Sequence, residues 1–177
     1  IENGHLIEEL PVANAILEKG INRKVLYVAL LLHDIGKGRM EDHSILGAKT
    51  ARKVAPRLGL TPDECATVEW LVRYHLLMSD MAQKRDIADP RTVKDFAKAV
   101  QTRERLDLLL VLTVCDIRAV GPDTWNNWKA ALLRALYRQT RRAMEDGLEA
   151  LNRDNRGSEA QSTLRDRLST WSETEIA

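Results

Sequence analysis

The sequence has few of the residues that build sheets or membrane spans. One Phe and five Pro occur among 177 residues, and no apolar run reaches the length that crosses a membrane. Leu, Ala, Arg, Lys and Glu dominate instead, which favours helices over β-branched sheets. No signal peptide is recognisable. We therefore expect an all-α, cytoplasmic protein that has no contact with a membrane.

An excess of charge of one sign is also absent. The sequence has 27 Lys and Arg against 26 Asp and Glu, a formal net charge of +1. Such a balance gives no general electrostatic attraction for nucleic acid or an anionic membrane, so neither is an expected partner. Hydrophobic residues make up 44%, enough for a core.

The only cysteines, Cys65 and Cys115, lack the spacing of a metal site. Both fall in apolar helical segments. We expect them to be reduced core residues of a cytoplasmic protein.

Apolar periodicity and capping residues predict a series of helices. The apolar run 25–32 predicts a central helix, because it is longer than a typical buried strand and has few β-branched residues. Thr61-Pro62-Asp63-Glu64 has the pattern of a capping box, and Asp89-Pro90 repeats a cap followed by proline. The other predicted helices cover 42–58, 62–75, 93–100, 103–119 and 123–145.

The domain prediction places the compact part at residues 1–147. Residues 148–177 are polar apart from a weaker helix at 164–171, and are expected to be a connector leading to C-terminal domains. Because the chain begins at Ile1 without an initiator Met and ends in an acidic stretch, we expect part of a longer, N-terminally truncated protein.

Ionisable groups interrupt three apolar segments: His33-Asp34, His75 and Asp116. An ionised carboxylate buried without a partner costs several kcal/mol. A divalent cation shared by His33, Asp34 and Asp116 would compensate, and imidazole with carboxylate suits Mn, Fe, Zn or a Mg-like ion. The alternatives are a satisfied core histidine and an aspartate that caps a helix or pairs with Arg118.

The order of these residues resembles the HD superfamily of metal-dependent phosphohydrolases. In that family a histidine is followed by a His-Asp pair and a later aspartate, with further histidines between them in two-metal members. His33, Asp34 and Asp116 match the last three positions, and His43 and His75 match the intermediate histidines. The resemblance implies an HD-domain helical bundle and a divalent metal cofactor held by these five residues.

A narrower resemblance covers about residues 25–137. The chain is similar to the HD domain of the bacterial bifunctional PII uridylyltransferase/uridylyl-removing enzymes. The matching stretches are Leu32-His33-Asp34-Ile35-Gly36-Lys37-Gly38-Arg39, Asp42-His43-Ser44, Trp70-Leu71-Val72-Arg73-Tyr74-His75, Cys115-Asp116-Ile117-Arg118 and Trp125-Asn126-Asn127-Trp128.

This resemblance implies a hydrolase of nitrogen regulation that removes UMP from the uridylylated PII signalling protein. Asp34 and Lys37 would be catalytic, because Lys37 lies three residues after Asp34 and can reach the same phosphate. Arg39 and Arg73 would bind the substrate phosphate. In the family the domain lies between a nucleotidyltransferase domain and C-terminal ACT domains, so the parent enzyme would be multifunctional and glutamine would regulate it through those other domains.

The family's first ligand histidine lies upstream, in an Asp-Glu-His context. The only upstream histidine here is His5, whose context and spacing do not fit, so we expect a surface residue there. The resemblance therefore implies a ligand before Ile1 and weak or absent activity of this chain alone.

Two other functions compete with this one. An HD hydrolase of a free nucleotide or an alarmone would differ in its products. A non-catalytic regulatory HD module, which relays glutamine sensing, need not bind a metal. A purely structural helical spacer would explain neither His33-Asp34 nor Asp116.

Overall fold

The structure is a computed structural model that describes residues 7–121 and 124–147. The chain divides into two units, 1–141 and 142–177, and the account below concerns the first. Every regular element within the described residues is helical, which confirms the all-α prediction. His5 and the predicted connector 148–177 with its helix lie outside the described residues, so both remain predictions.

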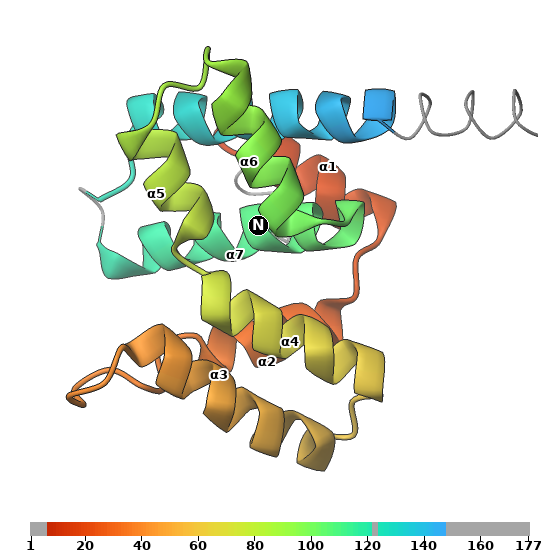
Figure 1. The fold of residues 1–177 in the computed structure, drawn as a ribbon, viewed down its shortest axis with the longest axis vertical. Coiled ribbons are helices and arrows are strands. Elements are labelled where there is room, and N and C mark those ends of the chain that lie inside the picture. The colour runs from red at the N-terminus through yellow and green to blue at the C-terminus, as the bar shows by residue number, and fades with distance from the viewer. Residues whose placement is uncertain (1–6, 122–123, 148–177) are drawn as a thin grey trace, which may run out of the picture. The chain divides into compact units, whose positions relative to one another are not determined.

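The described helices follow one another with short connections (Figure 1). They are α1 (Pro11–Lys19), α2 (Arg23–Leu32), α3 (His43–Val54), the 3-10 helix η1 (Ala55–Leu58), α4 (Pro62–Tyr74), α5 (Leu77–Lys84), α6 (Pro90–Val100), α7 (Arg103–Val120) and a further helix over 127–147. The sequence did not predict two of these helices, α1 and α5. Helix α1 has no side-chain cap at its start, and only two residues, neither of them proline or glycine, separate the end of α4 from the start of α5.

The capping box read from the sequence is present at the start of α4, and other helix ends are capped as well. The Thr61 hydroxyl accepts a hydrogen bond from the Glu64 backbone N–H at 3.3 Å, and the Glu64 carboxylate accepts one from the Thr61 N–H at 2.8 Å. Asp42 caps α3 by accepting from the Ser44 N–H at 2.8 Å. Gly59, with φ of +72°, ends η1 in the left-handed conformation that glycine adopts without steric cost.

Helix α7 is the central helix. It contacts α1, α2, α4, α5 and α6, and it crosses the middle of the molecule in Figure 1. Its side chains are buried along nearly the whole length, from Leu106 to Ile117. A helix buried on most of its circumference must be apolar on most of its circumference, which matches the run 108–115. Asp116, near the end of this run, is therefore carried into the interior.

The prediction that the run 25–32 is the central helix is wrong in its placement. Helix α2 forms there, but only one face of it is buried. Val25, Ala29 and Leu32 face the core at helical spacing, whereas Tyr27 and Leu31 are 48% and 70% exposed. A run without polar breaks cannot reveal which of its faces is covered.

The cysteine prediction also needs correction. Cys65 and Cys115 form no disulfide in the part of the chain that the structure describes, but both are half-buried and neither is a core residue. Their helices are apolar, yet both positions lie at the edge of the buried face, where the periodicity alone does not separate core from boundary.

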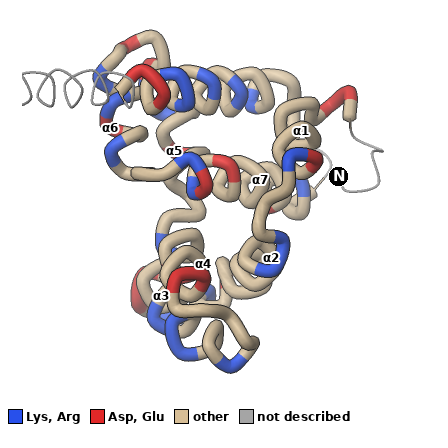
Figure 2. Tube along the Cα trace, turned by 90° about the vertical axis from the view of Figure 1, so that its right-hand side faces the viewer, with Lys and Arg blue, Asp and Glu red and all other residues tan. Residues whose placement is uncertain are grey.

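Charged residues of both signs share the surface helices. Figure 2 shows Lys and Arg close to Asp and Glu along α5 and α6, and pairs such as Lys84 with Asp80 at 2.8 Å and Arg85 with Asp95 at 3.7 Å join them. None of the helices that the structure describes is long and apolar enough to span a membrane.

Candidate metal centre

Two histidines occupy equivalent positions at the ends of two helices. His33 is the residue that follows α2, and His75 is the residue that follows α4. The Nδ1 atom of His33 lies 2.7 Å from the Leu30 carbonyl oxygen, and that of His75 lies 2.8 Å from the Val72 carbonyl oxygen. Because a carbonyl only accepts, both Nδ1 atoms carry a proton, and Nε2 is the atom that becomes a lone-pair donor when the ring is neutral. Backbone orientation of this kind is common among metal-binding histidines.

The turn after α2 brings Asp34 against the start of α3. A Cβ atom at Gly36 would lie 2.4 Å from the His43 carbonyl oxygen, so the backbone of this turn passes closer to α3 than a side chain at that position would allow without a shift. This close approach places Asp34 and His43 on the same side of the turn. The turn that contains Gly36 thus connects α2 to α3 with a close backbone contact.

The first group of ligand atoms is formed by His33, Asp34 and Asp116. The Nε2 atom of His33 lies 3.3 Å from a carboxylate oxygen of Asp34 and 3.3 Å from one of Asp116. One ligand atom from each of the three residues lies within 4.8 Å of the other two. Asp116 comes from α7, so residues 83 positions apart in the chain meet here.

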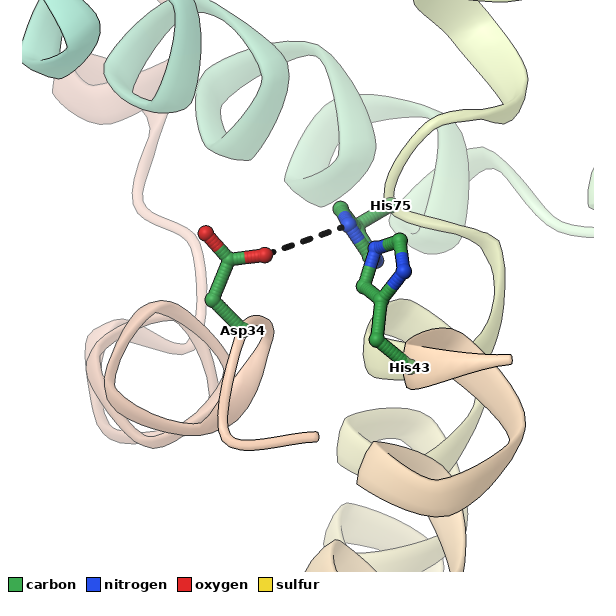
Figure 3. A group of neighbouring side chains, drawn as sticks. All are labelled: Asp34, His43 and His75. Atoms are coloured by element: carbon green, nitrogen blue, oxygen red, sulfur yellow. Dashed lines mark ion pairs between the residues drawn. The ribbon is translucent and has the colours of Figure 1, made fainter. Parts of the chain in front are cut away.

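The second group is formed by Asp34, His43 and His75 (Figure 3). The other carboxylate oxygen of Asp34 lies 3.8 Å from the His75 Nε2 atom, beyond hydrogen-bond distance. The rings of His43 and His75 meet edge to face with centroids 5.3 Å apart. Asp34 therefore belongs to both groups, with one oxygen near His33 and the other near His75.

Unsatisfied polar atoms mark this place in the interior. Four buried side-chain polar atoms of the described residues have no hydrogen-bond partner, and three of them are Asp34 Oδ1, His43 Nε2 and His75 Nε2. An unpaired buried polar group usually costs about 1–3 kcal/mol, so three together require another partner. A divalent cation fits this donor set, because one ligand atom from each of the three residues lies within 4.8 Å of the other two, and imidazole nitrogen and carboxylate oxygen both ligate such ions.

The charges in the cluster act on one another. The hydrogen bond that the His33 ring donates to Asp116 raises the pKa of His33, more than burial lowers it, and the same bond lowers the pKa of Asp116. Burial lowers the pKa of His75, which is 1% exposed and therefore favours the neutral, lone-pair form. A cation bound at the Nε2 atom of His33 would displace the proton that this atom otherwise donates to Asp116.

The three predicted phosphate-contacting residues lie in different places. The Lys37 ammonium is 2.5 Å from an Asp34 carboxylate oxygen, at the edge of the cluster. Arg39 is exposed in the turn before α3. Arg73 lies over the Tyr74 ring, 5.5 Å from its centroid, in a cavity beside α3 and α4. The structure therefore brings Lys37 to the five predicted ligands and places Arg73 on another face of α4.

The five ligands predicted from the sequence are the residues of the two groups, and their roles as ligands stay a prediction. Sequence reasoning missed the carbonyl groups of Leu30 and Val72 that orient two of the histidines. A histidine one residue beyond a helix end has the i−3 carbonyl within reach, so the helix boundaries are the signal that could have indicated them.

The chain belongs to the HD domain family, whose model matches residues 4–120. It is also similar over nearly its whole length to proteins named bifunctional uridylyltransferase/uridylyl-removing enzyme. Identity is 74% to that of Ruegeria pomeroyi, over 99% of this chain and 19% of the relative. It is 72% to that of Cereibacter sphaeroides and 57% to that of Azospirillum brasilense, each over 97% of this chain and 18% of the relative.

The chain therefore spans about a fifth of the length of these relatives. No solved structure gives a significant match.

Proposed function

We propose that this HD domain is a metal-dependent phosphodiesterase centre that removes UMP from the uridylylated PII signalling protein. The observation that carries the proposal is the pair of ligand groups that share Asp34. The names of the relatives supply the uridylyl-removing reaction, and the PII protein as substrate comes from the resemblance of the sequence motifs. The cation would be Mn, Mg, Fe or Zn, since the site mixes imidazole with carboxylate.

The protein side chains would hold and orient the reacting groups. When bound, a divalent cation polarises a phosphoryl oxygen and lowers the pKa of a water molecule. His33, Asp34 and Asp116 would form one end of its site, and His43 and His75 would extend the site to a second ion. The backbone bonds of His33 and His75 fix their ring orientation before any ligand arrives.

Lys37 would contact the substrate phosphate. Its ammonium lies at the open side of Asp34 and its side chain is 62% exposed, so it can turn from the carboxylate to an incoming phosphate oxygen. The leaving group would be a tyrosyl oxygen, and a phenol of pKa about 10 leaves without strong acid assistance. Arg39, which lies nearby in the sequence, would add positive charge on the same side.

The remaining assignments concern the longer protein. We propose that the HD domain extends to about residue 147 and that residues 148–177 connect it to C-terminal domains through which glutamine regulates hydrolysis. PII and glutamine are thus the expected partner and regulator. Arg73 is kept as a phosphate-binding candidate, although its position on another face of α4 favours Lys37 for direct contact.

The test is product analysis with three substrates: uridylylated PII, a free nucleoside triphosphate and an alarmone. We expect UMP release from PII in the presence of Mn²⁺, loss of release on chelation, and loss in Asp34→Asn. Both this chain and a form extended to the length of its relatives should be assayed, because this chain spans about a fifth of their length. Hydrolysis of a free nucleotide alone would favour the second hydrolase reading. Absence of both metal binding and hydrolysis in the extended form would favour a regulatory module.

A further inference from the structure

A second cavity lies beside the metal centre, on a different face of the same helices. It has a volume of about 420 Å³, within the range of small-molecule sites. Its walls come from α3, α4 and the start of α7. Tyr74 lines it and is followed in the chain by His75 of the cluster, so about 100° of helix rotation separates the two sites. Arg105 lies eleven residues before Asp116 on α7, which places that end of the cavity roughly 16 Å along the helix from the cluster.

Two guanidinium groups of this cavity rest on aromatic rings. Arg105 lies over Trp70, 5.0 Å from the ring centroid, and Arg73 lies over Tyr74 at 5.5 Å. The two rings contact each other with centroids 5.4 Å apart. Gln101 accepts a further hydrogen bond from Arg105 at 2.7 Å. These contacts hold both cations in place while leaving guanidinium N–H groups for an anion.

The charge of the cavity favours an anion. Arg73, Arg105 and Lys49 line it against one carboxylate, Glu69. This excess differs from the paired charges along α5 and α6 (Figure 2). Lys49 is held only loosely, 3.6 Å from Glu41, with its side chain 63% exposed, so it is available to a ligand.

The rest of the lining is apolar. Ile45, Ala48 and Ala66 form a surface of small aliphatic groups beside the two rings. A free inorganic anion would make no favourable contact with this apolar surface. A flat heterocycle, in contrast, can pack on aliphatic and aromatic groups and on guanidinium planes. A ligand that combines a flat ring with an anionic group, in a volume of this size, is a nucleoside monophosphate.

We propose that this cavity binds a nucleoside monophosphate, with the phosphate between Lys49 and Arg105 and the base against the aromatic pair. The proposal concerns a site separate from the hydrolytic cluster and does not require that the cluster be active. Only the choice of UMP as the first probe rests on the proposed function, since UMP is the product expected there.

The test is calorimetric titration of this chain with UMP, uridine and inorganic phosphate, all in EDTA. UMP is expected to bind about tenfold or more tightly than either part alone, corresponding to about 1.4 kcal/mol. Arg105→Ala should weaken UMP binding by about tenfold and Lys49→Ala by severalfold. Lys49 is exposed, so its substitution tests the site even if Arg105→Ala disturbs folding. Arg57→Ala, on η1 away from the cavity, is the matched control and should change nothing.

Asp34→Asn separates this proposal from the proposed function. It should abolish hydrolysis yet leave UMP binding in EDTA unchanged. Several results would overturn the proposal: no binding of UMP at millimolar concentration, binding lost in Asp34→Asn but kept in Lys49→Ala, or inorganic phosphate binding as tightly as UMP. Binding of an acidic peptide in place of UMP would assign the cavity to a protein partner and would overturn it as well.

Discussion

Helix α7 carries two half-buried carboxylates, Asp107 and Asp116, in contrasting surroundings. Their side chains are exposed to a similar extent, 17% and 19%. Asp107 receives hydrogen bonds from both the Arg103 guanidinium at 3.0 Å and the Tyr137 hydroxyl at 2.6 Å. Asp116 has one long contact, 3.3 Å from His33, and beyond it lies a cluster of unsatisfied ligand atoms.

The comparison teaches that burial of a carboxylate does not by itself indicate a metal site. Both aspartates interrupt the same apolar helix, and both need compensation for their buried charge. At Asp107 the protein supplies that compensation with its own cation and hydroxyl. At Asp116 the neighbours are one histidine, His33, and another carboxylate, Asp34, whose Oδ1 atom has no hydrogen-bond partner. Unsatisfied lone-pair donors, more than burial, distinguish a binding site from a structural pair.

The largest expected effect is a difference in hydrolytic activity between a variant of the candidate metal cluster and a variant of Asp107. In the extended form of the protein, Asp34→Asn should lower UMP release by more than about a hundredfold, the upper end of losses seen when groups that merely orient metal ligands are changed. Asp107→Asn makes the same chemical change at the carboxylate that Arg103 and Tyr137 hold. It should leave the rate of hydrolysis within a few fold of that of the unchanged protein. Rates measured with uridylylated PII and Mn²⁺ check both. Equal losses of activity in the two variants would contradict the distinction between a metal site and a structural carboxylate.

The second effect concerns stability with metal. A cation that binds only the folded state, at a hundred times its dissociation constant, should raise the free energy of unfolding of this chain by about 2.7 kcal/mol. The rise should persist in Asp107→Asn and fall strongly in Asp34→Asn. Urea unfolding with Mn²⁺ and with EDTA measures it. An undiminished rise in Asp34→Asn would show that the cation binds elsewhere.

The third effect appears without metal. In EDTA at pH 8, Asp107→Asn should lower the free energy of unfolding by about 1–3 kcal/mol, because Arg103 and Tyr137 lose a charged acceptor. Asp116→Asn should cost less, since it also relieves repulsion from Asp34. Chemical unfolding of the two variants under the same conditions provides the comparison, and a larger loss in Asp116→Asn would contradict it.

The smallest expected effect is a pH dependence of stability that arises from Tyr137 and its hydrogen bond to Asp107. Burial and the bond to Asp107 raise the pKa of Tyr137 to about 12, above the ordinary value near 10 that it has when unfolded. The folded state therefore keeps this proton longer, so its stabilisation is present below pH 10 and is lost as the pH rises toward 12. At pH 11 the loss should be about 1.4 kcal/mol. Tyr137→Phe should lack this part of the alkaline destabilisation, and the same slope in both proteins would contradict the assignment.

Much of the fold could be predicted because capping residues mark helix ends locally. Thr61 with Glu64, and Asp89 before Pro90, begin α4 and α6 as expected. Helix α5 could not be predicted as a separate element, because no breaker lies between His75 and Leu77. The central position of α7 depends on which faces are covered, and a uniformly apolar run such as 25–32 carries no such information.

The candidate site also has a part that the sequence could predict and a part that it could not. His33-Asp34, His43, His75 and Asp116 could be proposed from motif order, and the structure brings them together. Arg73 was expected to bind the substrate phosphate, but it lines the cavity beside α3 and α4, and it lies two residues before His75, which is about 200° of helix rotation. The cavity of Trp70 and Arg105 joins residues from different helices, which no local pattern indicated.

The most direct test of the account is the location of bound Mn²⁺ by anomalous diffraction from crystals of the metal-loaded protein. The account predicts a peak within coordination distance of His33, Asp34 and Asp116, and a second peak, if two ions bind, that shares Asp34 with His43 and His75. No peak should lie at Asp107, whose charge the Arg103 guanidinium already compensates and whose two oxygens already accept hydrogen bonds. A manganese ion bound at Asp107, or a peak that contacts none of His33, Asp34 and Asp116, would contradict the account.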